Sequence, residues 1–201
     1  MNIIKLLKKP KVICVCGNIH TGKSNLLHHI VNTLEESKKE YNLVTYGFKG
    51  KVKGATEINS VIELEEITDS FIIIDECFNL FDLDIPKQRK NIEKTFRTIK
   101  HKNNTIILCV VPENIKKFIA EKVDIYMFKK VNLHGFINGS MAKYIVTDYS
   151  GAEMGSRVLY LDPNECLIYD GKHYEKIIVP YYEKKDTKLK NKPLLRSKKA
   201  K

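Results

Sequence analysis

The motif G-x4-G-K-S constrains the fold and chemistry of this chain more than any other feature of its sequence. Its eight residues are Gly17, Asn18, Ile19, His20, Thr21, Gly22, Lys23 and Ser24. A β-branched run ending at Cys16 precedes the motif, and apolar residues at helical spacing follow it over 23–37. A strand, a glycine-containing loop and a helix in this order form a phosphate-binding loop, because backbone N–H groups and the helix N-terminus then surround the phosphates.

The ligands expected at this loop are ATP and Mg2+. We expect all eight residues to line the nucleotide site, with Lys23 reaching the β- and γ-phosphates and Ser24 binding Mg2+. His20 either touches a phosphate or fills a variable place in the motif. The alternative for the whole motif is a glycine-rich turn without a ligand.

Two acidic residues follow an apolar stretch further along the chain. The residues of 71–74 are Phe-Ile-Ile-Ile, and Asp75 and Glu76 come next. Such a stretch is typical of a strand buried on both faces, and its carboxyl end lies beside the loop in a parallel sheet. We expect Asp75 to bind Mg2+ and Glu76 to polarise the water that attacks the γ-phosphate, which favours hydrolysis over transfer to a small substrate. The alternative for Glu76 is a solvated acid at a strand end.

Strand-like and helix-like segments alternate over the first 130 residues. The expected strands are 11–16, 41–48, 71–75, 105–111 and 125–128, and the expected helices are 23–37, 86–101 and 112–122. The type of 57–66 stays open. This order predicts an α/β fold with a parallel sheet flanked by helices, and together with the phosphate-binding loop it resembles the P-loop NTPase (RecA-like) class.

Glycines break the chain into shorter pieces after residue 130. Expected strands are 143–149, 158–161, 166–169 and 176–179, and Asp170-Gly171 predicts a hairpin turn between the last two. We therefore expect one domain over 1–182, with a core at 11–130 and an antiparallel extension at 131–182. Residues 183–201 have few apolar side chains and predict a disordered tail.

The net charge of +11 belongs to the two ends of the chain. Residues 1–11 carry four lysines and no acid, and 183–201 carry nine lysines or arginines and two acids, which leaves 12–182 neutral. A basic arm of this kind predicts salt-dependent contact with the phosphates of double-stranded DNA. The alternative is that the lysines only keep the tail in solution.

Composition excludes several classes of protein. No apolar run approaches the roughly 18 residues of a membrane-spanning helix, and 1–11 does not resemble a secretory signal. Five cysteines, an odd number, stand mostly in apolar runs, which suits reduced thiols in the cytoplasm.

The two motifs and their order resemble the additional-strand, catalytic-glutamate class of P-loop ATPases, and within it the HerA/FtsK superfamily. The chain looks most similar to the genome-packaging ATPases of double-stranded DNA viruses and to the Zot-like ATPases of filamentous phages. The resemblance spans about 11–180 and includes 77–81, 96–101, 122–128 and 166–170. It implies a ring of five or six identical subunits that moves DNA, with a viral capsid or portal as a further partner, in the host cytoplasm or bound to the virion.

In this superfamily a neighbouring subunit supplies an arginine to the γ-phosphate. Arg97 is the best match for that role, Arg157 is a second candidate, and an intramolecular or surface ion pair is the alternative for Arg97. The chain departs from the family pattern after 105–111, where a polar sensor, often Gln, is usual. Only Cys109 is polar there until Glu113 and Asn114, and Asn114 serves only if the strand ends later than expected.

Two other readings of the function stay open. A small-molecule kinase needs an arginine-rich lid, which the chain does not show. A Zot-like assembly or morphogenesis factor would bind a protein partner and hydrolyse little ATP. Among the remaining side chains, we expect His28 and His29 to be satisfied or solvated and not metal ligands. Tyr181 and Tyr182 either cap the last strand or stack on bases.

Overall fold

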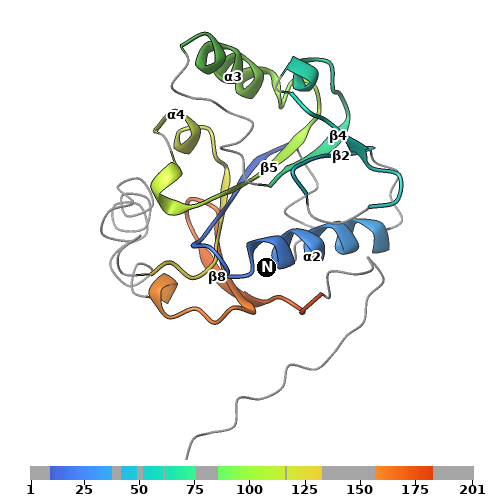
Figure 1. The fold of residues 1–201 in the computed structure, drawn as a ribbon. Coiled ribbons are helices and arrows are strands. Elements are labelled where there is room, and N and C mark those ends of the chain that lie inside the picture. Colours follow the sequence, from blue (N-terminus) through green and yellow to red (C-terminus); the bar gives the residue numbers. More distant parts are fainter. Residues whose placement is uncertain are drawn as a thin grey trace, which may run out of the picture.

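One eight-stranded sheet organises the part of the chain that the structure describes (Figure 1). The structure is a computed structural model, and it describes residues 10–37, 42–48, 52–60, 62–75, 86–115, 117–132 and 157–182. The strand order across the sheet is β3-β2-β4-β5-β1-β6-β7-β8.

The elements follow the predicted alternation. In chain order they are β1 (Val12–Cys16), α2 (Lys23–Glu36), β2 (Asn42–Tyr46), β3 (Thr56–Glu57), a 3-10 helix (Ile62–Glu65), β4 (Ser70–Ile74), α3 (Pro86–Thr98), β5 (Thr105–Val110), a 3-10 helix (Pro112–Asn114), α4 (Lys117–Ala120), β6 (Ile125–Phe128), β7 (Glu165–Tyr169) and β8 (Tyr174–Ile178). All pairings from β3 to β6 are parallel, and β7 and β8 join antiparallel. The predicted P-loop fold with a short antiparallel end is therefore confirmed.

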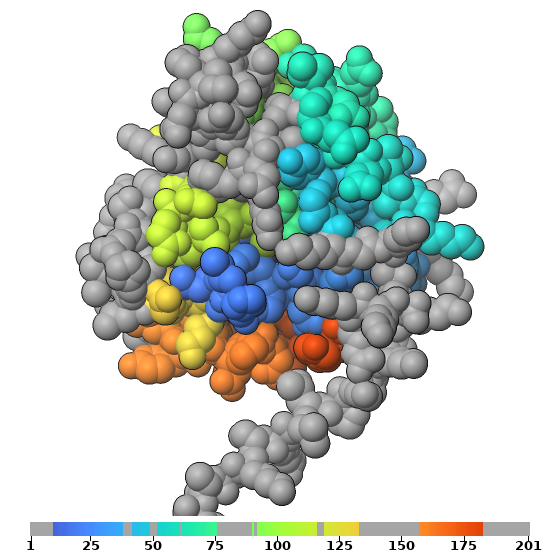
Figure 2. Space-filling model, in the orientation of Figure 1, coloured from blue at the N-terminus to red at the C-terminus, as the bar shows by residue number. Residues whose placement is uncertain are grey.

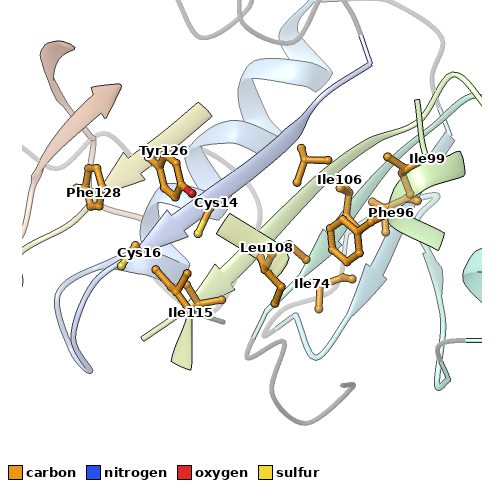
Figure 3. Packing of buried hydrophobic residues seen from close by; sticks show 14 of the residues in the cluster. Cys14, Cys16, Ile74, Phe96, Ile99, Ile106, Leu108, Ile115, Tyr126 and Phe128 are labelled. Carbon is orange, nitrogen blue, oxygen red and sulfur yellow. The ribbon is translucent and has the colours of Figure 1, made fainter. Parts of the chain in front are cut away.

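Helices cover the sheet on both faces, which is why its central strands are mostly apolar. One face packs against α2, where Leu26, Leu27 and Ile30 are buried with alternate residues of β1. Figure 3 shows the other face, where Phe96 of α3 lies beside Ile106 and other strand residues. This two-sided burial fixes the register of the strands and thereby the place of the loop that follows β1.

Two segments after β5 differ from their predictions. The helix expected over 112–122 is interrupted at Ile115, whose backbone is extended, so a 3-10 helix and α4 replace it. The strand expected over 158–161 is wrong, because 157–159 are helical. Val158 and Leu161 are buried while Tyr160 is 79% exposed, and burial three residues apart is a helical pattern.

Other predictions meet the structure only in part. The open segment 57–66 contains the end of β3 and the 3-10 helix. The strand expected over 143–149, residues 77–81, the N-terminal nine residues and the tail lie outside the described residues. No helix among the described residues is long and apolar enough to cross a membrane.

The hairpin and the thiols match their predictions. Gly171 has φ +91° in the turn between β7 and β8. Cys14, Cys16, Cys109 and Cys166 are buried reduced thiols. Burial raises the pKa of Cys16 and of Cys166 to about 12, so both thiols are protonated at neutral pH.

Candidate nucleotide-binding site

The predicted phosphate loop joins β1 to α2 at the carboxyl edge of the parallel strands. Gly17 donates its N–H to the Val110 carbonyl at the end of β5, at 3.3 Å, and Asn18 donates to the Lys130 carbonyl just beyond β6, at 3.1 Å. The loop is therefore held by both strands that flank β1. Figure 2 shows the blue segment that contains it at the surface, between the yellow-green residues near 110 and the orange C-terminal extension.

Close packing beneath the loop explains its two glycines. A Cβ at Gly17 would lie 2.6 Å from Cβ of Lys129, and a Cβ at Gly22 would lie 2.7 Å from the carbonyl oxygen of Pro163. Gly22 also has φ +86°, in the left-handed region that side chains disfavour. His20 has φ 62°. The inner side of the loop is thus packed against Lys129 and Pro163, and a ligand would bind at its outer side.

Lys23 reaches back across the loop from the first turn of α2. Its ammonium donates to the carbonyl oxygens of Gly17 and Asn18, at 2.8 Å each. Thr21 donates its hydroxyl to the same Asn18 carbonyl, at 2.7 Å. The Lys23 ammonium, which we expect to reach the β- and γ-phosphates, therefore lies over the loop before a nucleotide binds.

Ser24 and Asp75 meet although they are far apart in the sequence. The Ser24 hydroxyl donates to Oδ2 of Asp75 at 3.3 Å. Asp75 directly follows β4, is 3% exposed, and its N–H donates to the Tyr46 carbonyl at the end of β2, at 2.9 Å. A hydroxyl and a carboxylate oxygen are the hard donors that Mg2+ prefers, and Mg2+ usually keeps water and phosphate as its other ligands.

The donor set therefore fits Mg2+ bound with a nucleotide. Among the described residues there is no group of three His, Cys, Asp or Glu side chains that would hold a metal alone. A site of one hydroxyl and one carboxylate needs phosphate oxygens to complete it, so metal and nucleotide would bind together.

The structure describes only one of the two residues considered for positioning the attacking water, the predicted catalytic acid Glu76 and the candidate sensor Asn114. Glu76 lies outside the described residues. The strand β5 ends at Val110, and Asn114 lies in the following 3-10 helix, so the strand does not extend far enough for Asn114 to be the sensor at its end. Glu113 lies in the same 3-10 helix as Asn114.

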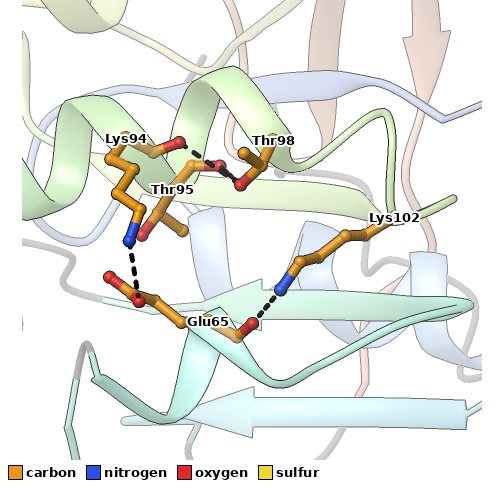
Figure 4. Close-up of polar contacts among 5 residues, drawn as sticks. All are labelled: Glu65, Lys94, Thr95, Thr98 and Lys102. Atoms are coloured by element: carbon orange, nitrogen blue, oxygen red, sulfur yellow. Dashed lines mark hydrogen bonds and ion pairs between the residues drawn. The ribbon is translucent and has the colours of Figure 1, made fainter.

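Arg97 lies away from the loop of its own chain. It is exposed in the last turn of α3, which leads into the amino end of β5. Figure 4 shows how that end of α3 is held: Lys94 pairs with the Glu65 carboxylate at 3.3 Å, and Lys102 donates to the Glu65 carbonyl. Asn104 then accepts from the Ser70 N–H at the start of β4, at 2.9 Å. The structure thus brings Lys23, Ser24 and Asp75 together and leaves Arg97 at the opposite edge of the sheet.

The second candidate arginine has an aromatic neighbour within the chain. The guanidinium carbon of Arg157 lies 5.3 Å from the centre of the Tyr174 ring. A cation over an aromatic face is a stabilising contact of its own.

The C-terminal end of the described chain is fastened to α2 one residue after Ser24. The Asn25 amide donates to the Pro180 carbonyl at 2.6 Å and accepts from the Tyr182 N–H at 2.7 Å. His29 Nδ1 lies 2.8 Å from the Tyr182 hydroxyl. Burial lowers the pKa of His29 against the opposing effect of Glu36. Tyr182 is therefore bound to α2, and Tyr181 is exposed.

Sequence reasoning missed Lys129, the residue after β6. Its side chain is fully buried, and its ammonium bonds the carbonyls of Pro163 and Glu165. A lysine directly after a wholly apolar strand was the only local indication, and lysines at strand ends are usually solvated. The contact of Lys129 with 163–165 depends on how the chain folds, and no pattern in the neighbouring sequence indicates it.

Comparison with known proteins identifies the family. The sequence model of the zonular occludens toxin (Zot) family matches residues 16–187. This chain belongs to the Zot family. No curated protein matches this Zot-family chain in sequence.

Solved structures share the fold of the Zot-family chain at low sequence identity. The DNA-packaging ATPase B204 from Sulfolobus turreted icosahedral virus matches with a TM-score of 0.63 and 17% identity, over 84% of this chain and 97% of B204. The genome-packaging NTPase B204 of Sulfolobus turreted icosahedral virus 2, with ATPγS, matches with a TM-score of 0.59 and 16% identity, over 88% and 97%. The conjugation coupling protein TcpA of pCW3, also with ATPγS, matches with a TM-score of 0.59 and 18% identity, over 88% and 62%.

The family match and the fold confirm the expected superfamily, the fold class and the enzyme class. The chain is a P-loop ATPase of the kind found in viruses, phages and mobile elements. The resemblances to Zot-like ATPases and to packaging ATPases thus point to one superfamily. They do not by themselves distinguish the two biological roles.

Proposed function

We propose that this chain is an ATP-hydrolysing motor that moves or packages double-stranded DNA as a homo-oligomeric ring. One observation carries the ATP part: Lys23, Ser24 and Asp75 meet at the loop that follows β1. The DNA part is supported by the fold shared with packaging NTPases and by the basic ends of the chain.

Residues of the loop bind and orient the triphosphate. The N–H groups of 18–24 and the start of α2 receive the phosphates, and Lys23 exchanges its bonds to the Gly17 and Asn18 carbonyls for bonds to phosphate oxygens. Ser24 and Asp75 would hold Mg2+, which neutralises charge on the β- and γ-phosphates when bound. Glu76 accepts a proton from the attacking water and so directs it at the γ-phosphate.

The second half of each site is supplied by a neighbouring subunit. Arg97 cannot reach the loop of its own chain, because α3 ends at the opposite edge of the sheet. That placement supports a role across an interface, where a planar guanidinium would contact the γ-phosphate. Mixing Arg97→Ala with Glu76→Gln subunits tests it: wild-type sites form at some interfaces and restore turnover, whereas failure to restore any turnover contradicts the role.

Contact with DNA is assigned to the basic ends, 1–11 and 183–201, in the host cytoplasm or at the virion, with a capsid or portal as the docking partner. Deleting 183–201 should weaken binding to duplex DNA and flatten its dependence on salt, because fewer counterions are released. An unchanged salt slope would assign the tail to solubility.

Displacement of a triplex-forming strand from duplex DNA tests the motor directly. The wild type should release the third strand only with hydrolysable ATP, and native mass measurement should show a ring of five or six copies. Glu76→Gln is the matched control, since it should bind ATP and DNA without releasing the strand. A monomer that hydrolyses ATP and releases no strand would refute the motor.

A second candidate is an assembly or morphogenesis factor of the Zot type. The match to the Zot family over 16–187 favours it. In that case ATP turnover would be slow, indifferent to DNA and stimulated by a protein partner.

A further inference from the structure

A buried lysine runs along the underside of the phosphate loop. Lys129 is 0% exposed, and its N–H donates to the Cys16 carbonyl at 2.7 Å, which extends the pairing of β6 with β1 by one residue. Its ammonium donates to the carbonyls of Pro163 and Glu165, at 2.7 and 2.5 Å.

The side chain spans the loop from one glycine to the other. Cβ of Lys129 lies under Gly17, 2.6 Å from where a Cβ would stand. Its Cε and Nζ lie under Gly22, 3.5 and 3.6 Å from the corresponding point. The ammonium is therefore close to the N-terminus of α2, which already carries partial positive charge.

The charge has little compensation from the protein. Within the described residues no carboxylate lies at ion-pair distance from Lys129, and the Glu165 carboxylate bonds Lys176 at 2.6 Å instead. Burial lowers the pKa of Lys129, and the smaller effects of Cys166 and Glu165 oppose this. A buried cation without an anion is costly, and Lys23 and the helix terminus add charge of the same sign. A bound polyphosphate would relieve all three.

We propose that Lys129 is a positioning residue of the nucleotide site, whose buried ammonium favours polyphosphate on the loop above it. The residue does not touch the nucleotide. It acts through its fixed positive charge beneath the loop and by holding 163–165 in place there. Its contribution to the binding free energy therefore grows with the number of phosphates. The proposal rests on the binding of phosphates at 17–24.

Affinities for AMP, ADP and ATP in two variants test this. Lys129→Gln removes the charge and keeps a donor for the carbonyls, and Lys129→Met removes both. At one fixed Mg2+ concentration, we expect ATP affinity to fall about tenfold or more, ADP affinity to fall less, and AMP affinity to stay within about twofold. Lys176→Met is the matched control, because it removes a charge bound to the other side of Glu165, and it should leave all three affinities unchanged.

The outcomes separate this proposal from the proposed function. Equal losses for the three nucleotides, or no loss, would overturn the role of Lys129 while leaving the ATP site intact. A wild type that binds no ATP would overturn the site itself.

A measurement on the wild type covers the case in which both variants unfold. The 13Cε signal of Lys129 is followed against pH with and without pyrophosphate. The titratable groups that act on Lys129 in the protein are Cys166 and Glu165. The pKa of Lys129 should rise when pyrophosphate binds. A pKa that pyrophosphate does not move would overturn the proposal.

Discussion

Gly22→Ala tests the close packing of the phosphate loop against Pro163. The new methyl group has two separate costs, one from the backbone conformation and one from this contact. The backbone has φ +86°, and an L side chain in that region costs about 1–2 kcal/mol. The methyl carbon would also stand 2.7 Å from the Pro163 carbonyl oxygen. That oxygen cannot retreat freely, because Lys129 is bonded to it.

Forcing an atom into such a packed site typically costs a further 1–3 kcal/mol, roughly. The expected loss of unfolding free energy is therefore about 2–5 kcal/mol. Gly54→Ala is the matched control, because Gly54 has φ +81° and nothing within 4 Å of its Cβ position. Its loss should be the backbone part alone, about 1–2 kcal/mol.

Urea unfolding of the two variants measures the difference. With a slope of about 2 kcal/mol per molar, the midpoint of Gly22→Ala should lie about 0.5–1.5 M below that of Gly54→Ala. ATP affinity should fall at least about tenfold in Gly22→Ala and stay unchanged in Gly54→Ala, since only the first change displaces the loop. Equal midpoints for both variants would refute the close contact between the loop and Pro163.

Three further changes have defined outcomes. Asp75→Asn should abolish the gain in ATP affinity that Mg2+ gives and leave binding in EDTA nearly unchanged, as calorimetry with and without metal would show. Asn25→Ala removes two bonds to the chain at 180–182 and should lower the unfolding free energy by about 1–3 kcal/mol in urea; a loss below about 0.5 kcal/mol would mean that the clamp is not formed in solution. His29 has a lowered pKa when folded, so the unfolded chain binds more protons as pH falls below about 6.5 and the fold loses stability there. Thermal unfolding of His29→Phe between pH 7.5 and 5 should show a shallower loss than the wild type, and an identical loss would place that proton linkage elsewhere.

The central part of the fold could be predicted because its strands are recognisable from their own residues. Strands such as β1 and β5 are buried at every residue and apolar over most of their length, which indicates a parallel sheet covered by helices. The loop and its acid follow from two short motifs whose places in such a sheet are fixed by topology. The Ser24–Asp75 contact is a direct result of that topology.

The parts that escaped prediction depend on contacts between distant segments. Lys129 is buried because 163–165 returns beneath the loop, and no local pattern encodes that return. Asn25 binds 180–182 for the same reason. All four residues of 158–161 are apolar, so the sequence shows no helical spacing there and the short run predicts a strand. The burial of Val158 and Leu161 with an exposed Tyr160 between them is visible only in the folded chain.

The rate of phosphate release from ATP, measured with and without linear duplex DNA, tests the central claim most directly. The account predicts Mg2+-dependent release that duplex DNA accelerates, and no release above background from Lys23→Met under either condition. A rate in the wild type that duplex DNA leaves unchanged would contradict the DNA motor, and release that survives in Lys23→Met would contradict the site.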